Sequence, residues 1–181
     1  MSVDLNFRRT LWSEADAQRT MRPLMPLVDT VMANEEDLQA VLGIEVARAD
    51  PVSGALDVAG YRAAAERVAS EFGVKRVAVT LRQSLSASEN GWSGVLLDRA
   101  AGTFHCSSRY TVRLVDRIGG GDSFAAGLIY GIVTGRPPER SLAFAVAASA
   151  LKQTIPGDFN RVSVDEVDRL VAGDASGRVR R

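Results

Sequence analysis

The fold of this chain is decided by one stretch, Asp116-Arg117-Ile118-Gly119-Gly120-Gly121-Asp122-Ser123-Phe124-Ala125-Ala126-Gly127. A β-rich run ends at Val115, just before the stretch, and a long alanine-rich helical pattern follows it. Glycines allow turns that other residues cannot form, and they let a ligand approach the backbone closely. A helix that opens directly after them presents unpaired N–H groups and the positive end of its dipole. The stretch therefore predicts a strand, a glycine turn suited to an anion such as phosphate, and a helix.

Asp122 is the unexpected residue in such a turn, because a carboxylate is repelled by a phosphate group. Its presence makes sense if it accepts the proton of a hydroxyl group that attacks the phosphate. A simpler interpretation is that Asp is favoured near the start of a helix without any catalytic role. The residues alone leave both interpretations open.

The composition fits a globular protein with one domain. The chain has 181 residues, of which 46% are hydrophobic and 24% charged, enough for a proper core. Its 22 basic and 22 acidic residues cancel, which indicates neither nucleic acid nor an anionic membrane as a partner. No apolar run is long enough to span a bilayer, and the first residues lack the features of a signal peptide. Cys106 is the only cysteine, so no internal disulfide can form and a cytoplasmic location is expected.

The glycine stretch resembles the C-terminal signature of the ribokinase-like (PfkB) carbohydrate kinases, written D-x-x-G-x-G-D-x-F-x-x-G. Every fixed position of the signature matches, namely Asp116, Gly119, Gly121, Asp122, Phe124 and Gly127. Residues 151–160 read LKQTIPGDFN, and this run makes the chain most similar to the 2-dehydro-3-deoxygluconate kinase branch of the family. The resemblance implies an α/β protein with the ribokinase-like three-layer α/β/α fold and a mostly parallel sheet.

The same resemblance implies a reaction. It makes Gly119, Gly120 and Gly121 the anion hole for the transferring phosphate and Asp122 the catalytic base. The γ-phosphate of ATP, with Mg²⁺, is expected to move to the 6-hydroxyl of 2-dehydro-3-deoxygluconate or a similar sugar acid. The chain has no G-x-x-x-x-G-K-[ST] motif, which excludes a P-loop enzyme. An oxidoreductase is disfavoured, because Phe124 stands where a dinucleotide-binding G-x-G-x-x-G motif has its last glycine.

A second motif near the N-terminus concerns the substrate. The branch pattern D-x-N-x-R-x-x-L-W matches at Asp4, Asn6, Arg8, Leu11 and Trp12. The resemblance implies that Asn6 and Arg8 bind the sugar acid, with Arg8 on its carboxylate, a task suited to a planar bidentate donor. Without the surrounding match, Arg8 would be interpreted as a solvated surface arginine.

Nucleotide contacts are expected after the strand at 75–81. Thr80 and Arg82 are candidate ATP contacts at the start of a polar loop over 82–92, and Asn160 is a third. Arg82 stands where many family members have glycine, and a solvated arginine on the loop is an equally good interpretation.

A metal role is suggested by residues 34–37, which read Asn-Glu-Glu-Asp where the family has an N-x-x-E motif. Asn34 and Asp37 are therefore candidates for the Mg²⁺ shell, acting through water. The alternative is structural: Asn is a good N-cap, and acidic residues are favoured in the first turn of a helix.

The remaining patterns predict the order of elements. Strands are expected at 2–6, 28–33, 75–81, 91–97, 103–106 and 109–115, and helices at 13–24, 34–42, 57–72, 122–134, 138–154 and 163–172. Loops are expected at 44–54 and at 98–102, and residues 173–181 are expected to form a flexible tail.

The resemblance covers almost all of this chain but only the C-terminal half of the family's domain. We therefore expect residues 1–172 to form the C-terminal part of a carbohydrate kinase domain, truncated at the N-terminus. Its first strand would then present an edge open to self-association or to a partner chain. The alternative to a sugar kinase is a catalytically incomplete half-domain that binds nucleotide or pairs with such a partner.

Overall fold

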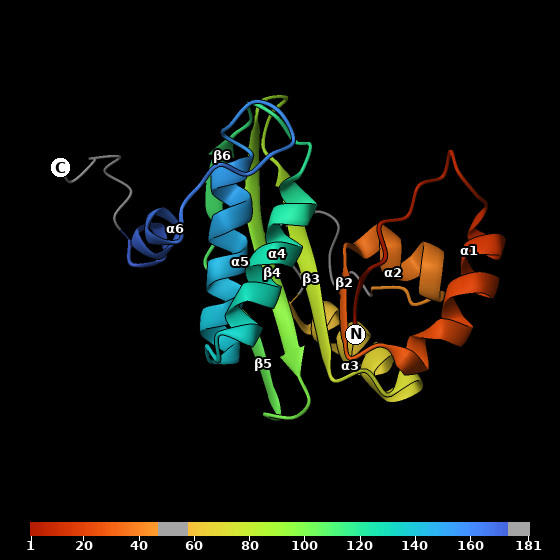
Figure 1. Ribbon diagram of the computed structural model, residues 1–181. Coiled ribbons are helices and arrows are strands. Elements are labelled where there is room, and N and C mark those ends of the chain that lie inside the picture. Colours follow the sequence, from red (N-terminus) through yellow and green to blue (C-terminus); the bar gives the residue numbers. More distant parts are fainter. Residues whose placement is uncertain (47–57, 174–181) are drawn as a thin grey trace. The chain divides into compact units, whose positions relative to one another are not determined.

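A computed structural model describes residues 1–46 and 58–173 (Figure 1). The expected loop at 44–54 lies largely outside these residues, as does the expected tail after Gly173. The elements are, in chain order, β1 (Ser2–Asp4), α1 (Glu14–Met21), the 3-10 helix η1 (Arg22–Leu27), β2 (Thr30–Ala33), α2 (Glu35–Leu42), α3 (Val58–Phe72), β3 (Arg76–Ser84), β4 (Glu89–Asp98), β5 (Thr103–Cys106), β6 (Tyr110–Arg113), α4 (Gly120–Val133), α5 (Pro138–Lys152) and α6 (Val164–Val171).

The chain divides into two compact units. The first consists of Met1–Leu81 and Gly94–Cys106, and the second of Arg82–Ser93 and the described part of Ser107–Arg181. One mixed sheet has the strand order β1-β2-β3-β4-β5, with β6 also paired to β4. β2 is parallel to β1 and to β3, whereas β4 is antiparallel to both β5 and β6. β1 stands at one end of this strand order, as expected for the first strand.

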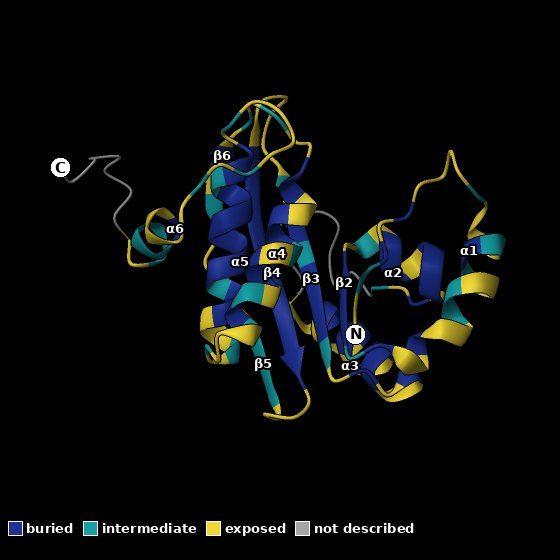
Figure 2. Cartoon of the chain, in the orientation of Figure 1, coloured by how far each residue is buried: buried dark blue, intermediate teal, exposed yellow. Residues whose placement is uncertain are grey.

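The core of the first unit forms around β2. All four of its residues are buried, as Figure 2 shows in dark blue. A strand that is buried on both faces is typical of a parallel sheet, and its apolar sequence predicts this. Helices α2 and α3 add apolar side chains to the same cluster, among them Leu38, Val41, Leu42, Ala65 and Val68. Gly43, in the left-handed conformation with φ 68°, ends α2 where the sequence predicts.

Helices α4 and α5 pack together in the second unit through small residues. A Cβ added at Gly127 would lie 2.8 Å from the Cα of Ala145, and one at Gly131 would lie 2.6 Å from the Oγ of Ser141. Larger side chains would therefore force the two helices apart. α6 packs against α5 in a cluster that includes Val167 and Phe144. None of the helices within residues 1–46 and 58–173 is long and apolar enough to cross a membrane.

The boundaries of several elements differ from those expected. α1 stops at Met21 and continues as η1, because Pro23 and Pro26 lack the N–H that an α-helix needs. The polar loop expected at 82–92 is mostly strand, and only 85–88 form the turn between β3 and β4. The N–H groups of Leu85 and Ser86 both donate to the Glu89 carbonyl, which closes a tight hairpin. Polar residues on the exposed ends of strands give the same sequence signal as a loop.

Candidate active site

The glycine turn takes its shape from Gly119. This residue is the N-cap of α4 and adopts the left-handed conformation, with φ 76°. A Cβ at this position would lie 2.1 Å from the carbonyl oxygen of Asp158, so the chain requires glycine here for two independent reasons. Gly120 and Gly121 then form the first turn of α4, two residues earlier than the sequence predicts.

The start of α4 leaves backbone donors available. The N–H of Gly120 donates to the Arg117 carbonyl at 3.2 Å. Within residues 1–46 and 58–173, the N–H groups of Gly119, Gly121 and Asp122 have no hydrogen-bond acceptor. α4 is 14 residues long, so its dipole adds positive potential at these donors. Unpaired N–H groups at the start of a helix are able to bind an anion.

Asp122 lies in the first turn of α4 with an exposed side chain. No hydrogen bond or ion pair engages its carboxylate within the described parts of the chain, and it does not cap the helix. An exposed carboxylate without a partner, beside free N–H donors, is available to accept a proton from a bound hydroxyl group.

Asp116 fastens the front of the turn to the loop that follows α5. Its carboxylate accepts hydrogen bonds from the N–H groups of Ile118 and Gly157, each at 3.0 Å. These two bonds hold the pKa of the Asp116 carboxyl below its usual range. The N–H groups of Val115 and Asp116 in turn donate to the Gln153 carbonyl, at 2.9 and 3.2 Å. Asp116 is therefore a structural member of the signature.

The end of α5 supports the turn from behind. The Oγ of Ser149, a fully buried residue, donates to the Gly120 carbonyl at 2.7 Å. The amide of Gln153 donates back to the Ser149 carbonyl at 3.3 Å, and its side chain lies where a Cβ at Gly120 would make contact. The sequence assigned no role to Ser149 and placed Gln153 only within the motif of residues 151–160, because polar residues in or beside an alanine-rich helix give no local signal of their partner.

Asn160 lies further along the same segment, and both ends of its amide contact the backbone. Its Nδ2 donates to the Ala148 carbonyl at 3.4 Å, and its Oδ1 accepts from the Val162 N–H at 3.0 Å. These contacts hold the loop before α6 on α5. Contact of Asn160 with a nucleotide stays a prediction.

The substrate motif lies in the first unit, directly after β1. Asn6 is exposed and has φ 40°, the one positive φ among the described residues other than glycine. Asn tolerates this region better than most residues, and such outliers concentrate at functional sites. Arg8 is also exposed, and its Nη1 donates to the Phe7 carbonyl at 2.9 Å. Both polar side chains are thus presented outward from a segment that Leu5 and Phe7 anchor in the core.

Asp37 fixes this segment to the start of α2. It is 4% exposed, and its Oδ1 accepts from the Phe7 N–H at 2.9 Å while its Oδ2 accepts from the Asn34 N–H at 3.0 Å. Asn34 returns the contact by accepting from the Asp37 N–H at 2.9 Å, which completes a capping box. Burial raises the pKa of the Asp37 carboxyl, while its N–H donors oppose the rise.

These contacts bear on the expected Mg²⁺ shell. Both oxygens of Asp37 already accept backbone hydrogen bonds, and Asn34 is engaged as the N-cap. Across the described residues, no three side chains of His, Cys, Asp or Glu come together as metal ligands would. A role of Asn34 and Asp37 near Mg²⁺ through water stays a prediction, and their structural role stands beside it.

Replacing Asp37 by Asn tests the structural role. The amide offers one acceptor oxygen, so its NH₂ group must face one of the two N–H donors. We expect a loss of about 1–3 kcal/mol in the free energy of unfolding, measured by denaturant titration. Glu36→Gln is the matched control, since Glu36 is exposed and pairs with the exposed Arg9, and it should cost under about 1 kcal/mol. Unchanged stability of Asp37→Asn, with an altered Mg²⁺ dependence of activity, would favour the metal role instead.

The remaining candidate ATP contacts lie on β3. Thr80 belongs to the first unit, is half-buried and donates from Oγ1 to the Ala33 carbonyl at 3.4 Å. Arg82 belongs to the second unit and lies within the strand, although a loop was expected there. Its exposed guanidinium has no partner in the described parts of the chain.

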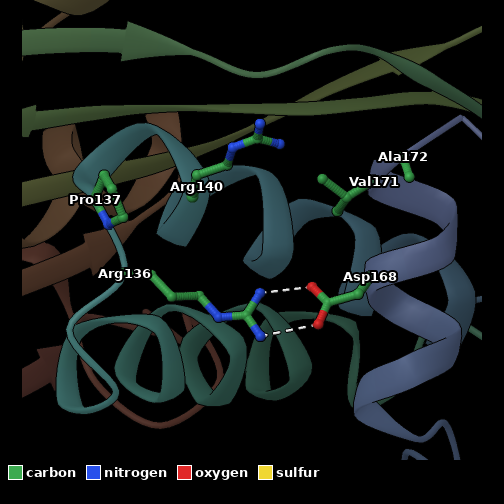
Figure 3. Close-up of a pocket in the computed structure, with 6 residues that line it drawn as sticks. All are labelled: Arg136, Pro137, Arg140, Asp168, Val171 and Ala172. Carbon is green, nitrogen blue, oxygen red and sulfur yellow. Dashed lines mark hydrogen bonds and ion pairs between the residues drawn. The ribbon is translucent and has the colours of Figure 1, made fainter.

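A pocket of about 380 Å³ also lies in the second unit (Figure 3), and none of the predicted site residues lines it. Arg136 makes a bidentate ion pair with Asp168, at 2.6 and 2.9 Å, and stacks on the Phe144 ring at 4.5 Å. Figure 3 shows the guanidinium directed at the carboxylate of Asp168 on α6. The pair joins the α4–α5 connection to α6.

The fold and the glycine turn define an α/β protein of the ribokinase-like class. A family model described as pfkB family carbohydrate kinase matches residues 1–161, and the chain belongs to this family. This confirms the family expected from the signature, together with its fold. The chain spans about half the length of the relatives it matches.

Three relatives illustrate the match. The crystal structure of 2-dehydro-3-deoxygluconokinase from Thermotoga maritima has a TM-score of 0.87 and 44% identity, covering 95% of this chain and 50% of that chain. A 2-dehydro-3-deoxygalactonokinase from Haloferax volcanii is 34% identical over 176 residues, which are 97% of this chain and 48% of the relative. A PfkB family carbohydrate kinase from Listeria grayi has a TM-score of 0.78 and 31% identity, covering 94% and 49% of the two chains.

Proposed function

We propose that this chain carries the phosphoryl-transfer machinery of a sugar-acid kinase that uses ATP. The observation that carries the proposal is the start of α4, where N–H donors that have no acceptor among the described residues lie in the same turn as the exposed Asp122 carboxylate. ATP supplies the γ-phosphoryl group, and Mg²⁺ neutralises charge on its phosphates. The cytoplasm is the expected compartment.

In the proposed step, the oxygen of the sugar hydroxyl bonds to the γ-phosphorus, and Asp122 accepts the proton of that hydroxyl. The bond from the γ-phosphorus to the β,γ-bridging oxygen breaks, and ADP leaves. The N–H groups of Gly119, Gly121 and Asp122 stabilise the charge on the transferring group, as preorganised donors do without reorientation. The N–H of Gly120 is engaged by the Arg117 carbonyl and would have to leave it before joining the anion hole.

The proposed substrate is 2-dehydro-3-deoxy-D-gluconate or a similar sugar acid, phosphorylated on its 6-hydroxyl. The named Thermotoga maritima and Haloferax volcanii relatives support this class and differ in the sugar, gluconate in one and galactonate in the other. In the proposal Asn6 and Arg8 bind the sugar acid, with the Arg8 guanidinium on its carboxylate. Thr80, Arg82 and Asn160 are proposed to contact ATP.

The test is ADP release by the purified chain with Mg-ATP and either 2-dehydro-3-deoxygluconate or its galactonate epimer. We expect ADP release that depends on the sugar acid, and weaker release with a sugar of equal length that lacks the carboxylate. Equal rates with and without the carboxylate would reject a sugar-acid kinase.

A second candidate function is that of a half-domain that binds ATP but needs a partner chain for turnover. It is favoured by the position of β1 at the end of the strand order, because an edge strand can pair with another chain. ATP binding without ADP release, in a folded sample, would support it. Turnover by a monomer would argue against it.

A further inference from the structure

Lys152 is the last residue of α5, and its side chain is fully buried. It is 0% exposed, and its Nζ lies 3.3 Å from the Ile155 carbonyl oxygen and 3.5 Å from that of Asp116. Within the described residues no carboxylate pairs with it. The other lysine of the chain, Lys75, shows the usual arrangement, since it is 64% exposed and pairs with Asp29 at 2.7 Å.

Such burial is costly for an ammonium group. Removing the group from water carries a large free-energy cost, and two long contacts to carbonyl oxygens offset only part of it. A lysine that only capped the end of α5 could do so from the surface, where it would keep its hydration. Full burial of Lys152 therefore indicates a task that needs a positive charge at this place.

The two carbonyl groups identify the place. Asp116 begins the signature that leads into Gly119. Ile155 belongs to the loop after α5, which passes beside Gly119, where the Asp158 carbonyl excludes a Cβ. The ammonium joins these two segments behind the turn. Its charge also reaches Asp116, whose pKa is lowered first by backbone hydrogen bonds and then by Lys152.

The residue type fits the same task. Arg is the common basic residue of this chain, and Lys75 and Lys152 are its only lysines. An ammonium is a compact point charge with three donors, whereas a guanidinium is planar and larger. A small enclosed site lined by carbonyl oxygens favours the ammonium.

We propose that Lys152 is a positioning residue for phosphoryl transfer, which holds the Asp116 and Ile155 carbonyls together and adds positive potential behind the anion hole. The inference rests on the proposed function and deepens the same site. Because the charge is enclosed, it acts on a phosphate bound at the turn with little screening by salt.

The first test uses the unaltered chain. With two lysines, a spectrum of ¹⁵N-lysine side-chain ammonium groups contains two signals, and Lys75 is the internal reference. We expect the Lys152 signal to shift on addition of ATP but not of adenosine, while the Lys75 signal stays in place. A Lys152 signal that ignores ATP, although the Gly121 amide signal responds, would overturn the inference. If neither signal responds to ATP, the anion hole itself fails, and with it both proposals.

The second test removes the charge and keeps the length of the side chain. Lys152→Met should lose little stability, because removal of a buried ion offsets the loss of its two long carbonyl contacts. Its affinity for ATP should fall about tenfold, while its affinity for adenosine stays unchanged. The control Lys75→Met should bind both ATP and adenosine as tightly as the parent does. A merely structural lysine predicts the reverse, a less stable chain that binds ATP normally, and that result would overturn the inference. Should Lys152→Met fail to fold, the resonance test on the unaltered chain still decides.

Discussion

Asp122→Asn is expected to lower the rate of ADP release by roughly two to four orders of magnitude, the usual contribution of a general base. The amide has nearly the shape of the carboxylate but cannot accept the hydroxyl proton. Asp122 is exposed and makes no contact that stabilises the described structure, so the fold should be unaffected. ATP affinity should hold or rise slightly, because a negative charge beside the phosphates is removed.

The measurement is kcat and KM for both substrates, together with ATP affinity by calorimetry. Asp165→Asn is the matched control, since Asp165 is likewise an exposed acid in the first turn of a helix, α6. The kcat, KM and ATP affinity of Asp165→Asn should equal those of the parent. This control separates loss of the base from loss of helix-dipole stabilisation. Turnover retained in Asp122→Asn would remove Asp122 from the mechanism, whereas parallel loss of ATP binding would point to damage at the turn.

The sequence predicts the glycine turn well because its determinants are local. One short stretch, Asp116 to Gly127, contains the glycine with positive φ, the start of the helix and the spacing of the signature. The N-cap role of Asn34 is predicted from local sequence in the same way, whereas the reciprocal bond by which Asp37 completes a capping box was found only in the structure. The helices and strands that were expected from apolar periodicity are present for the same reason, since that periodicity is a property of each segment.

The supports of the site were not predictable, because they depend on contacts between distant segments. Lys152 contacts a carbonyl 36 residues away, and the Phe7 N–H reaches Asp37 across 30 residues. Lys152 belongs to the motif of residues 151–160, but nothing local to it shows that its side chain is buried rather than exposed at the end of a helix. The predicted end of the strand, just before Arg82, was wrong for a related reason. Strand pairing, not the polar composition of the segment, decides where β3 ends.

Gly119→Ala is the second variant with a large expected effect. An alanine at φ 76° costs about 1–2 kcal/mol from backbone sterics alone. Its Cβ would also lie 2.1 Å from the Asp158 carbonyl oxygen, a backbone atom that cannot rotate away like a side chain. Overpacking of this kind adds about 1–3 kcal/mol, so we expect a total loss near 2–5 kcal/mol in the free energy of unfolding.

Gly135→Ala separates the two costs of this change. Gly135 has nearly the same conformation, φ 73°, but a Cβ there would meet no atom within 4 Å. It should therefore show the backbone cost alone, and Gly119→Ala should exceed it by the overpacking cost in a denaturant titration. If the turn opens to relieve the contact, the N–H donors of Gly121 and Asp122 change direction, so ATP affinity should fall for Gly119→Ala only. Equal losses of unfolding free energy in the two variants, with ATP affinity unchanged, would contradict this expectation. They would mean that the Asp158 carbonyl moves away at little cost and that the turn tolerates a side chain at its N-cap.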